Sequence, residues 1–377
     1  MLTLPDYPWD AMASYRELAS AHPDGLVNLS IGTPVDPTPQ VIQQALAQSA
    51  DAPGYPTTHG TPALREAIAG WFARRRGVQG LDPAHILPTV GSKEFVAWLP
   101  TLLGLTRDDV VLRPRVAYPT YDIGAQIAGA QAVATDDPME LDESVLARVK
   151  LIWLNSPGNP TGRVDSVEHM REVVALARRI GAVVASDECY AELPWDVDEA
   201  PSILDPRVSG DSHKGLLAVY SVSKQSNLAG YRAAFTAGCP RLIAGLLNTR
   251  KHAGMIMPMP VQAALQAAMD DDAHVEAQRE LYRRRRAILK PALEEAGFTV
   301  EHSAAGLYLW TTDRSGRFSQ PAAPESADTW QMVRHMAERG ILVGPGVFYG
   351  EAGSGYIRVA LTATDERISA AAERLTA

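Results

Sequence analysis

One lysine in the chain stands where a nucleophile or base would be useful. The segment SVSKQSNLAGYR, residues 221–232, places Lys224 between serines after the apolar run GLLAVYS, with Arg232 eight residues later. A lysine amine at the end of a buried strand can act as a base or bind a carbonyl if burial lowers its pKa. The structural alternative is a solvated loop lysine, and these twelve residues taken alone favour it.

Two other segments place polar residues where predicted strands end. SDECY, residues 186–190, carries Asp187 and, three residues later, Tyr190. A buried aspartate is costly without a cationic partner, although a capping aspartate is the structural alternative. NSPGNPTG, residues 155–162, contains Asn159, whose amide suits a phenolate or carbonyl oxygen; the alternative is a tight loop built by the prolines and glycines.

A fourth segment has the character of an anion site. PTVGSKEF, residues 88–95, places Gly91, Ser92 and Lys93 where a predicted strand turns into a helix. Free N–H groups and the helix dipole make such a turn suitable for a phosphate or carboxylate. Ordinary helix capping explains a Gly-Ser pair equally well, so the fragment alone leaves both interpretations open.

These segments are positioned by short β-rich runs that alternate with helical patterns from about residue 40 to residue 238. The runs are HILPTV, DVVLRP, AQAVATD, VKLIWLN, GAVVASDE, LLAVYSVS and AAFTAG. Their spacing predicts an α/β fold with a mainly parallel sheet covered by helices on both faces. Ligands of such sheets bind beyond the carboxyl ends of the strands, where the four segments lie.

The rest of the chain predicts two further parts. Residues 1–39 read as an arm with a short helix near residues 11–20, attached to a small domain. Residues 40–268 form the large domain, and residues 269–377 a smaller α+β domain with the order strand, strand, helix, strand. The arginines at 283–286 read as a solvated helix face, and the Pro/Ala/Ser-rich stretch from Pro321 to Ala327 as a mobile surface loop.

Bulk composition excludes several classes of function. The chain has 377 residues, 46% of them hydrophobic, which is typical of two globular domains. A net charge of −9 argues against a nucleic-acid partner, and two cysteines without metal-ligand spacing predict neither a disulfide framework nor a metal site. The first residues, MLTLPDYPWD, do not form a signal peptide, and no apolar run reaches the roughly twenty residues of a membrane span. We therefore expect a cytoplasmic protein.

The order of the motifs adds a resemblance that no single motif carries. VGSK, AYPTY, NSPGNPTG, SDECY, SVSKQSNLAGYR and YIRVAL follow one another along the chain. In order and spacing they resemble the fold-type I aminotransferases of class I and II, which use pyridoxal 5'-phosphate (PLP), across nearly the whole chain. The resemblance implies that fold, that cofactor, and amino acids and 2-oxo acids as substrates.

The resemblance also implies roles for individual residues around the cofactor ring. Lys224 binds the cofactor covalently and then acts as the base. Asp187 pairs with the pyridine nitrogen, which keeps the ring able to accept electrons. Asn159 and Tyr190 hydrogen-bond the phenolic oxygen of the ring, and Tyr118 stacks on it. Cys189 reads as a packed small residue rather than a nucleophile.

Other roles concern the phosphate and the substrate. An arginine suits a phosphate or a carboxylate because its planar fork engages two oxygens. Arg358 is expected to bind the substrate α-carboxylate, assisted by the backbone near Gly32. Tyr55 matches a tyrosine that reaches the phosphate of the neighbouring subunit, which implies a homodimer with shared active sites. The residues expected at the phosphate of their own subunit are Gly91, Ser92, Lys93, Ser221, Ser223 and Arg232.

Within this family the chain is similar to the actinobacterial succinyldiaminopimelate aminotransferases. LSIGTPVDPTP, SVSKQSNLAGYRAAF and RKHAGMIMPMPVQAAL carry this likeness. It implies amino exchange between glutamate and N-succinyl-2-amino-6-oxopimelate in lysine and diaminopimelate biosynthesis. The distal carboxylates of both substrates need a further donor, for which Lys251, Arg250 and Arg115 are candidates beside ordinary surface charge.

Three alternatives remain at this point. The first is another class I/II aminotransferase, of aspartate, aromatic or alanine type. The second is a β-lyase that uses the same cofactor to cleave C–S bonds. The third is a non-catalytic ligand sensor of the kind found in aminotransferase-like regulators; those carry an N-terminal winged helix, whereas only about forty residues precede the large domain here.

Overall fold

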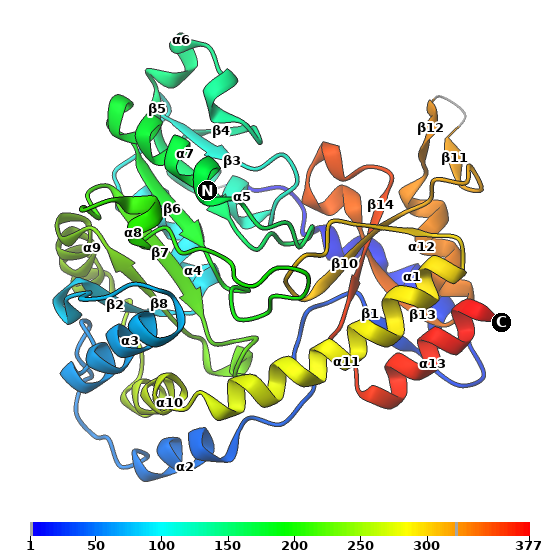
Figure 1. Ribbon diagram of the computed structural model, residues 1–377, viewed down its shortest axis with the longest axis horizontal. Helices are drawn as coiled ribbons and strands as arrows, with labels where there is room; N and C mark the ends of the chain where they lie inside the picture. Colours follow the sequence, from blue (N-terminus) through cyan, green and yellow to red (C-terminus); the bar gives the residue numbers. More distant parts are fainter. Residues whose placement is uncertain (1–2, 321–322) are drawn as a thin grey trace.

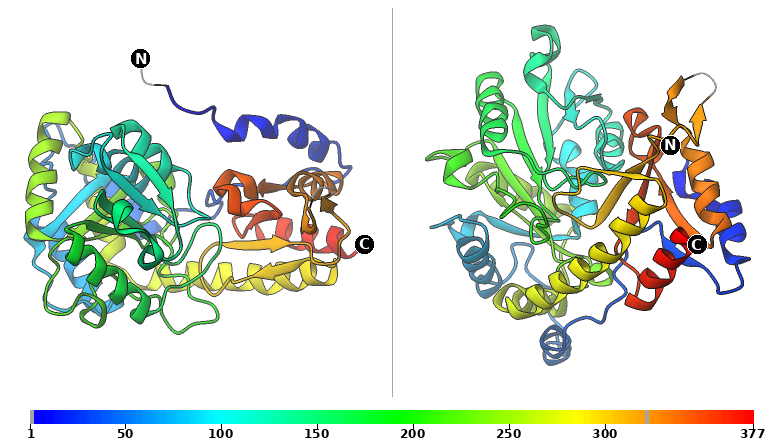
Figure 2. Two further views of the ribbon diagram at one scale, coloured as in Figure 1. Left: turned by 90° about the horizontal axis from the view of Figure 1, so that it is seen from above. Right: turned by 45° about the vertical axis from the view of Figure 1, so that its right-hand side comes forward.

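The computed structural model describes residues 3–320 and 323–377 of the chain. It shows a large domain built on a seven-stranded sheet and a smaller domain built on a five-stranded sheet (Figure 1). The long helix α11 (Ala273–Glu295) runs from the large domain along the small one (Figures 1 and 2). Helix α1 (Ala13–Ser20) of the amino-terminal arm lies beside the small domain. The amino-terminal arm therefore belongs spatially with the carboxyl-terminal part.

The large sheet confirms the predicted α/β fold. Its strand order is β2-β8-β7-β6-β5-β3-β4, and only β8 runs against its neighbours. All seven β-rich runs of the sequence form strands: β2 (Ile86–Val90), β3 (Val110–Arg113), β4 (Gln131–Ala134), β5 (Val149–Asn155), β6 (Val183–Asp187), β7 (Leu216–Ser221) and β8 (Ala233–Gly238). Because β5, β6 and β7 are parallel neighbours, their carboxyl ends meet at one edge.

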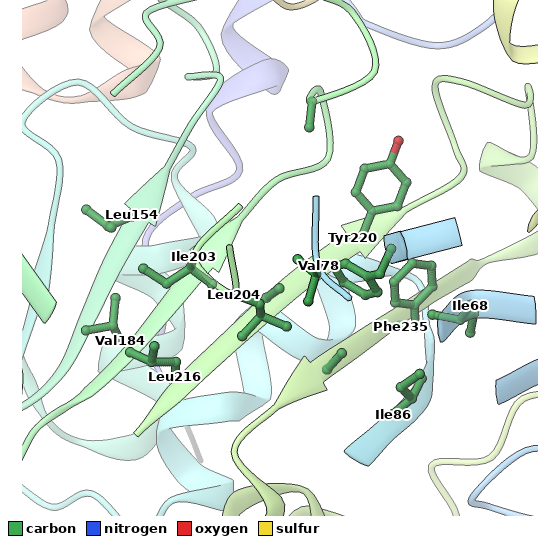
Figure 3. Close-up of a cluster of buried hydrophobic side chains, with 14 of the residues drawn as sticks. Ile68, Val78, Ile86, Leu154, Val184, Ile203, Leu204, Leu216, Tyr220 and Phe235 are labelled. Carbon is green, nitrogen blue, oxygen red and sulfur yellow. The ribbon is translucent and has the colours of Figure 1, made fainter. Parts of the chain in front are cut away.

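Helices cover both faces of this sheet, and β7 shows how the sequence separates the two cores. Leu216 and Ala218 belong to one buried cluster, whereas Leu217 and Val219 belong to the other, as the two-residue period of a strand requires. The first cluster is drawn in Figure 3 and packs under α2 (Gln40–Gln48), α3 (Pro62–Arg75), α7 (Val167–Ile180), the short α8 (Pro206–Ser209) and α10 (Met259–Asp270). The second packs under α4 (Ser92–Leu102), α5 (Thr120–Ala128) and α9 (Pro240–Ala253). The one-turn helix α6 (Glu143–Leu146) precedes β5.

The small domain has a mixed sheet with the order β1-β13-β14-β10-β9. Its edge strand β1 comes from the amino-terminal arm and pairs in parallel with β13. The strands are β1 (Val27–Leu29), β9 (Thr299–Glu301), β10 (Tyr308–Thr312), β13 (Ile341–Pro345) and β14 (Tyr356–Ala360), and the remaining helices are α1 (Ala13–Ser20), α12 (Thr329–Glu338) and α13 (Asp365–Thr376). Strands β10 and β14 are antiparallel, with Trp310 opposite Arg358, so this pairing positions the arginine.

Two local expectations differ from the structure. Part of the predicted surface loop forms a ribbon of β11 (Ser319–Gln320) and β12 (Ala323–Ala327), while Pro321 lies outside the described residues. The turn before the ribbon is tied by Asp313, which accepts hydrogen bonds from the backbone N–H groups of Ser315 and Phe318. Local side-chain bonds of this kind were not visible in the composition of the loop.

The arginine run in α11 is the second difference, because it is not only a solvated face. Arg285 is 2% exposed and its guanidinium binds Asp36 of the arm at 2.6 Å and Asp365 of α13 at 2.7 Å. The helix turns every 3.6 residues, so one arginine of four successive ones must face inward. The buried ion pairs of Arg285 join the arm, α11 and α13.

None of the helices within residues 3–320 and 323–377 has the length and apolar character needed to cross a membrane.

Candidate active site

Lys224 lies just after β7, at the edge where the large sheet faces the small domain. Its Nζ donates a hydrogen bond to the carbonyl oxygen of Gly32 in the arm. Burial lowers the pKa of this amine, and the Arg358 and Arg232 cations act in the same direction. The Tyr308 phenol opposes this effect, and the described residues offer Lys224 no carboxylate ion pair.

Asp187 is the last residue of β6 and is buried. Its carboxylate accepts hydrogen bonds from the Tyr121 hydroxyl at 2.9 Å and from the backbone N–H of Cys189 at 3.2 Å. Burial raises the pKa of Asp187, and no cation of the described chain pairs with it to oppose that effect. A buried carboxylate without a cation is costly, so binding of a positively charged group beside Asp187 would be favourable.

Asn159 and Arg358 connect the two domains at this edge. The Asn159 Oδ1 accepts a hydrogen bond from Arg358 Nη1 at 3.0 Å, and Arg358 Nη2 donates to the Ser30 carbonyl at 2.7 Å. Arg358 is 4% exposed, yet its Nε has no hydrogen-bond partner within the described chain. A buried, partly unpaired guanidinium can receive a carboxylate.

Aromatic rings surround the Arg358 guanidinium. Its Cζ lies 4.0 Å from the ring centroid of Tyr308, 4.9 Å from that of Tyr349 and 5.8 Å from that of Trp9. Tyr190, three residues after Asp187, places its hydroxyl 3.2 Å from the Tyr308 hydroxyl. The group that receives a carboxylate is therefore enclosed by rings from β10, the arm and the segment after β13.

The opposite end of the site brings two anion-binding features together. The guanidinium of Arg232 packs directly against Gly91 at the start of α4, where an added Cβ would lie 2.1 Å from Arg232 Nη2. Gly91 has a φ of +79°, and α4 begins at Ser92 with free N–H groups. The hydroxyls of Ser221 and Ser223 are buried and 2.8 Å apart. This cradle is suited to a phosphate.

The remaining predicted residues have different surroundings. Tyr118 is partly buried in the loop between β3 and α5, and burial raises its pKa to about 12. Lys93 is exposed and lies over the ring of Tyr7 in the arm, at 5.8 Å. Tyr55 is fully exposed, which keeps it out of the packed site of its own chain. Cys189 is buried against Asp187, as expected of a packed small residue.

The candidates for a distal substrate group separate in the structure. Arg250 is fully buried and binds Glu94 of α4 at 2.9 Å, so its guanidinium is already paired; this arrangement does not fit the substrate role expected for it. Lys251 is exposed at the end of α9. Arg115 is exposed and lines a cavity of about 300 Å³ beside the NSPGNPTG loop, together with Asn155. Lys224 does not line that cavity.

Comparison with known proteins decides the family. Residues 24–375 match the model of the family described as aminotransferase class I and II. The chain belongs to this family. Members of class I and II depend on PLP, and their substrates are amino acids and 2-oxo acids. Full-length relatives named as a transaminase and a probable aminotransferase support an enzyme rather than the sensor alternative.

Several relatives resemble the chain along its full length. It is 55% identical to 4-dedimethylamino-4-oxo-anhydrotetracycline transaminase OxyQ of Streptomyces rimosus, covering 100% of both chains. It is 54% identical to the probable aminotransferase Rv1178 of Mycobacterium tuberculosis, covering 99% of this chain and 86% of that protein. A solved structure from Thermus thermophilus, a probable N-succinyldiaminopimelate aminotransferase, superposes with a TM-score of 0.83 at 29% identity, covering 97% of each chain.

The residues present fit the cofactor of this family. Asp187 supplies a buried carboxylate that lacks a cation, as a protonated pyridine nitrogen would require. Lys224 supplies an amine with a lowered pKa. The close approach of Arg232 to Gly91 forms a phosphate cradle that a Cβ would fill. Each polar part of PLP thus has a matching group along one edge of the sheet.

Sequence reasoning missed three groups of this site. Tyr121 follows Tyr118 by three residues, a helical spacing that signals a shared face at the start of α5. Tyr308 stands in GLYLW, which reads as an ordinary apolar strand, and Trp9 stands in an arm whose path cannot be read from sequence. The pairing of β10 with β14 brings Tyr308 near Arg358. The packing of the arm brings Trp9 there.

Proposed function

We propose that this aminotransferase exchanges an amino group between glutamate and N-succinyl-2-amino-6-oxopimelate, in lysine and diaminopimelate biosynthesis. It would act as a cytoplasmic homodimer with shared active sites. Two findings support the acceptor: the likeness to the Thermus thermophilus structure, and a 34% identity to an LL-diaminopimelate aminotransferase of Gloeobacter violaceus over 99% of this chain. The sequence motifs quoted above point to the same branch.

The observation that carries the proposal is the burial and incomplete hydrogen bonding of Arg358. Its buried guanidinium is held by Asn159 and Ser30 but keeps Nε unpaired. A bidentate pair with an α-carboxylate would satisfy that donor, and glutamate and the succinylated keto acid both carry such a group. Arg358 would therefore hold each substrate in turn in the same orientation, whichever distal group follows.

The remaining residues would hold the cofactor and move protons. When bound, PLP supplies a ring that stabilises negative charge at the substrate Cα. Asp187 would hold the pyridine nitrogen, Asn159 and Tyr190 the phenolic oxygen, and Tyr118 one face of the ring. Lys224 Nζ, whose pKa burial lowers, would take the proton from the substrate Cα.

The phosphate would lie between Arg232, the two serines before Lys224 and the start of α4. Gly91, Ser92 and Lys93 form that start, and Ser221 and Ser223 offer buried hydroxyls. Two contributions extend the site: the Gly32 backbone beside Lys224, and Tyr55 from the partner chain. Lys251 is proposed as a donor to the distal carboxylate.

A second acceptor class is favoured by a specific observation. The Arg358 guanidinium is enclosed by the rings of Trp9, Tyr308 and Tyr349, and such walls suit a flat, ring-containing ketone as well as a flexible chain. OxyQ, with 55% identity, is named as a transaminase of a 4-oxo-anhydrotetracycline. The second candidate is therefore amination of a polycyclic ketone, with an amino acid as donor.

An acceptor panel tests these proposals. The purified holoenzyme is given glutamate with N-succinyl-2-amino-6-oxopimelate, with 4-dedimethylamino-4-oxo-anhydrotetracycline, and with the keto acids of aspartate, aromatic amino acids and alanine; 2-oxoglutarate formation is followed. The first proposal requires the highest kcat/KM on the succinylated ketone. Preference for the tetracycline ketone would replace it by the second. Cystathionine is included, because release of pyruvate and ammonia would identify a β-lyase.

A further inference from the structure

The hydroxyl of Tyr308 occupies a position that the proposed chemistry leaves without a role. Tyr308 lies on β10, is 4% exposed, and reaches from the small domain to the edge of the large sheet. Its hydroxyl is 3.2 Å from the Tyr190 hydroxyl and against the backbone of Gly32, where an added Cβ would lie 2.0 Å away. The Gly32 carbonyl in turn accepts from Lys224, so Tyr308 lies between the cofactor-facing and substrate-facing groups.

The positive charge nearest the Tyr308 ring has no carboxylate partner among the described residues. Arg358 stacks on the Tyr308 ring at 4.0 Å and has no carboxylate partner among the described residues; its hydrogen bonds go to an amide and a carbonyl. A buried guanidinium without an anion is unfavourable. The titratable and charged groups that face Tyr308 from other elements are Tyr190, Lys224, Arg358, Tyr118, Tyr282 and Tyr349.

Four of the six facing groups are phenols, and they differ from Tyr308 in how readily they could supply a negative charge. Burial raises the pKa of Tyr190, Tyr118, Tyr282 and Tyr349. Burial also raises the pKa of Tyr308, but the Arg358 and Lys224 cations and the hydrogen bond from Tyr190 outweigh it, so the pKa of Tyr308 lies below its ordinary value. Tyr308 also lies nearer the Arg358 guanidinium than Tyr349 does, with 4.0 Å against 4.9 Å from Cζ to the ring centroid, so its ionisation is favoured by position as well.

We infer that Tyr308 is a positioning residue that serves as the internal counter-anion of Arg358 while no substrate carboxylate is bound. Its oxygen then accepts the hydrogen bond from the Tyr190 hydroxyl and fixes that hydroxyl in place. This inference rests on the proposed role of Arg358 as the carboxylate site. It assigns to Tyr308 a function in keeping the empty site organised, beyond the packing expected of an aromatic residue in a strand.

The proton balance follows directly. In the empty site the Tyr308 O–H bond breaks heterolytically and the proton passes to solvent water. When a substrate carboxylate binds Arg358, two anions would share one cation, so Tyr308 takes a proton back from solvent. Binding thus consumes one proton at pH values above the Tyr308 pKa. By linkage, carboxylate affinity falls about tenfold per pH unit in that range.

Tyrosinate absorbance in the near ultraviolet tests the inference without turnover. The full chain is stripped of cofactor, which leaves Lys224 as the free amine that the structure describes, and titrated upward in pH. One of the 12 tyrosines should ionise below the ordinary value near 10. Tyr308→Phe should remove that transition. Saturating 2-oxoglutarate, used as the carboxylate probe, should move it upward by about one unit or more.

Two further variants separate this role from simple packing. Arg358→Gln removes the cation and should move the transition upward, although Tyr308 and its neighbours remain. Tyr356→Phe is the matched control, because Tyr356 also lies in the small-domain sheet but donates its hydroxyl to Glu301 at 2.8 Å. That variant should keep the low transition. Circular dichroism of each variant verifies that the chain is folded.

Several results would overturn the inference. They are titration of all wild-type tyrosines at or above the ordinary value, persistence of the low transition in Tyr308→Phe, and absence of a shift when 2-oxoglutarate is bound. None of these results bears on which ketone the enzyme aminates, because the titration involves no turnover. Conversely, failure of the succinylated ketone in the acceptor panel leaves the tyrosinate experiment intact.

Discussion

Lys224 follows β7 and Asp187 ends the neighbouring strand β6. Burial shifts the pKa values of these two side chains in opposite directions. Removal from water disfavours the charged form of each, so the pKa of the lysine falls and that of the aspartate rises. The amine becomes a better base near neutral pH. The carboxylate gains from any cation that enters its site, and a protonated pyridine nitrogen provides one.

The first residue-scale prediction concerns Lys224. Replacement by alanine removes the amine proposed to bind the cofactor and to take the Cα proton, so kcat should fall by at least about 10²-fold. Borohydride reduction of wild-type holoenzyme should attach the cofactor to Lys224, as read by peptide mass spectrometry. Lys214→Ala, at an exposed lysine before β7, is the control and should retain full turnover. Wild-type rates in Lys224→Ala would refute the assignment.

The second residue-scale prediction concerns Asp187. Asparagine keeps the shape but removes the charge that stabilises a cationic ring nitrogen, and such electrostatic losses at a transition state correspond to about 10²-fold or more in kcat. The neighbouring Glu188 is a matched control, because it is also buried but binds Arg76 at 3.2 Å. Glu188→Gln should lower the Tm while kcat stays within about threefold. If Asp187→Asn behaves in the same way, its carboxylate is only structural.

At this scale the sequence predicted residues that belong to compact motifs. Lys224, Asp187 and Asn159 each stand beside prolines, glycines or serines that mark a strand end, so their proximity follows from a parallel sheet. Tyr308 carries no such mark, since its role depends on Arg358, which is 50 residues later in the chain. The ion pair of Arg250 could not be predicted for the same reason, because its partner Glu94 is distant in sequence.

At the scale of elements, the start of α4 is the part of the site most sensitive to a small change. Gly91 and Gly104 flank this helix and have almost equal φ values, +79° and +75°. A Cβ at Gly91 would meet Arg232, whereas a Cβ at Gly104 would meet nothing within 4 Å. The two positions therefore separate backbone strain from loss of the phosphate cradle.

Alanine at either glycine should cost about 1–3 kcal/mol of stability, because both have a positive φ that other residues rarely adopt. Only Gly91→Ala should also displace Arg232 and raise the Kd for PLP, by about tenfold or more, since charge-assisted hydrogen bonds contribute about 1.5–3 kcal/mol. Absorbance titration of the cofactor-free chain with PLP measures this Kd. Equal Kd values for the two variants would show that Arg232 does not depend on Gly91.

Most elements were predictable because their periods are clear. The seven strands of the large sheet are short apolar runs separated by helical patterns, whereas their order in the sheet was not predicted. The ribbon β11–β12 was not predictable, because its residues have weak strand character and the turn that precedes it depends on Asp313. Likewise, the partners of Arg285 come from both ends of the chain.

At the scale of the whole molecule, the candidate active site lies between the two domains. One residue predicted to belong to it, Tyr55, does not pack against it in the same chain. Tyr55 is fully exposed, and the arm residues Leu4 and Tyr7 are 38% and 58% exposed. Large exposed aromatic and aliphatic side chains are typical of surfaces that another chain covers. A homodimer in which Tyr55 completes the partner's phosphate site accounts for this exposure, and a two-fold axis would then give two equivalent sites.

Subunit complementation tests this arrangement. Tyr55→Ala should weaken PLP binding and reduce activity, and Lys224→Ala should be inactive. In a mixed dimer, the Tyr55→Ala chain supplies Lys224 to one site, and the Lys224→Ala chain supplies Tyr55 to the same site. That site therefore has both wild-type residues. Unfolding and refolding the two variants together should therefore give more activity than the sum of the two refolded separately. A mixture of Tyr55→Ala with itself is the control for refolding losses. If Tyr55 instead acts within its own chain, no mixed site combines it with Lys224, and the mixture should show no gain.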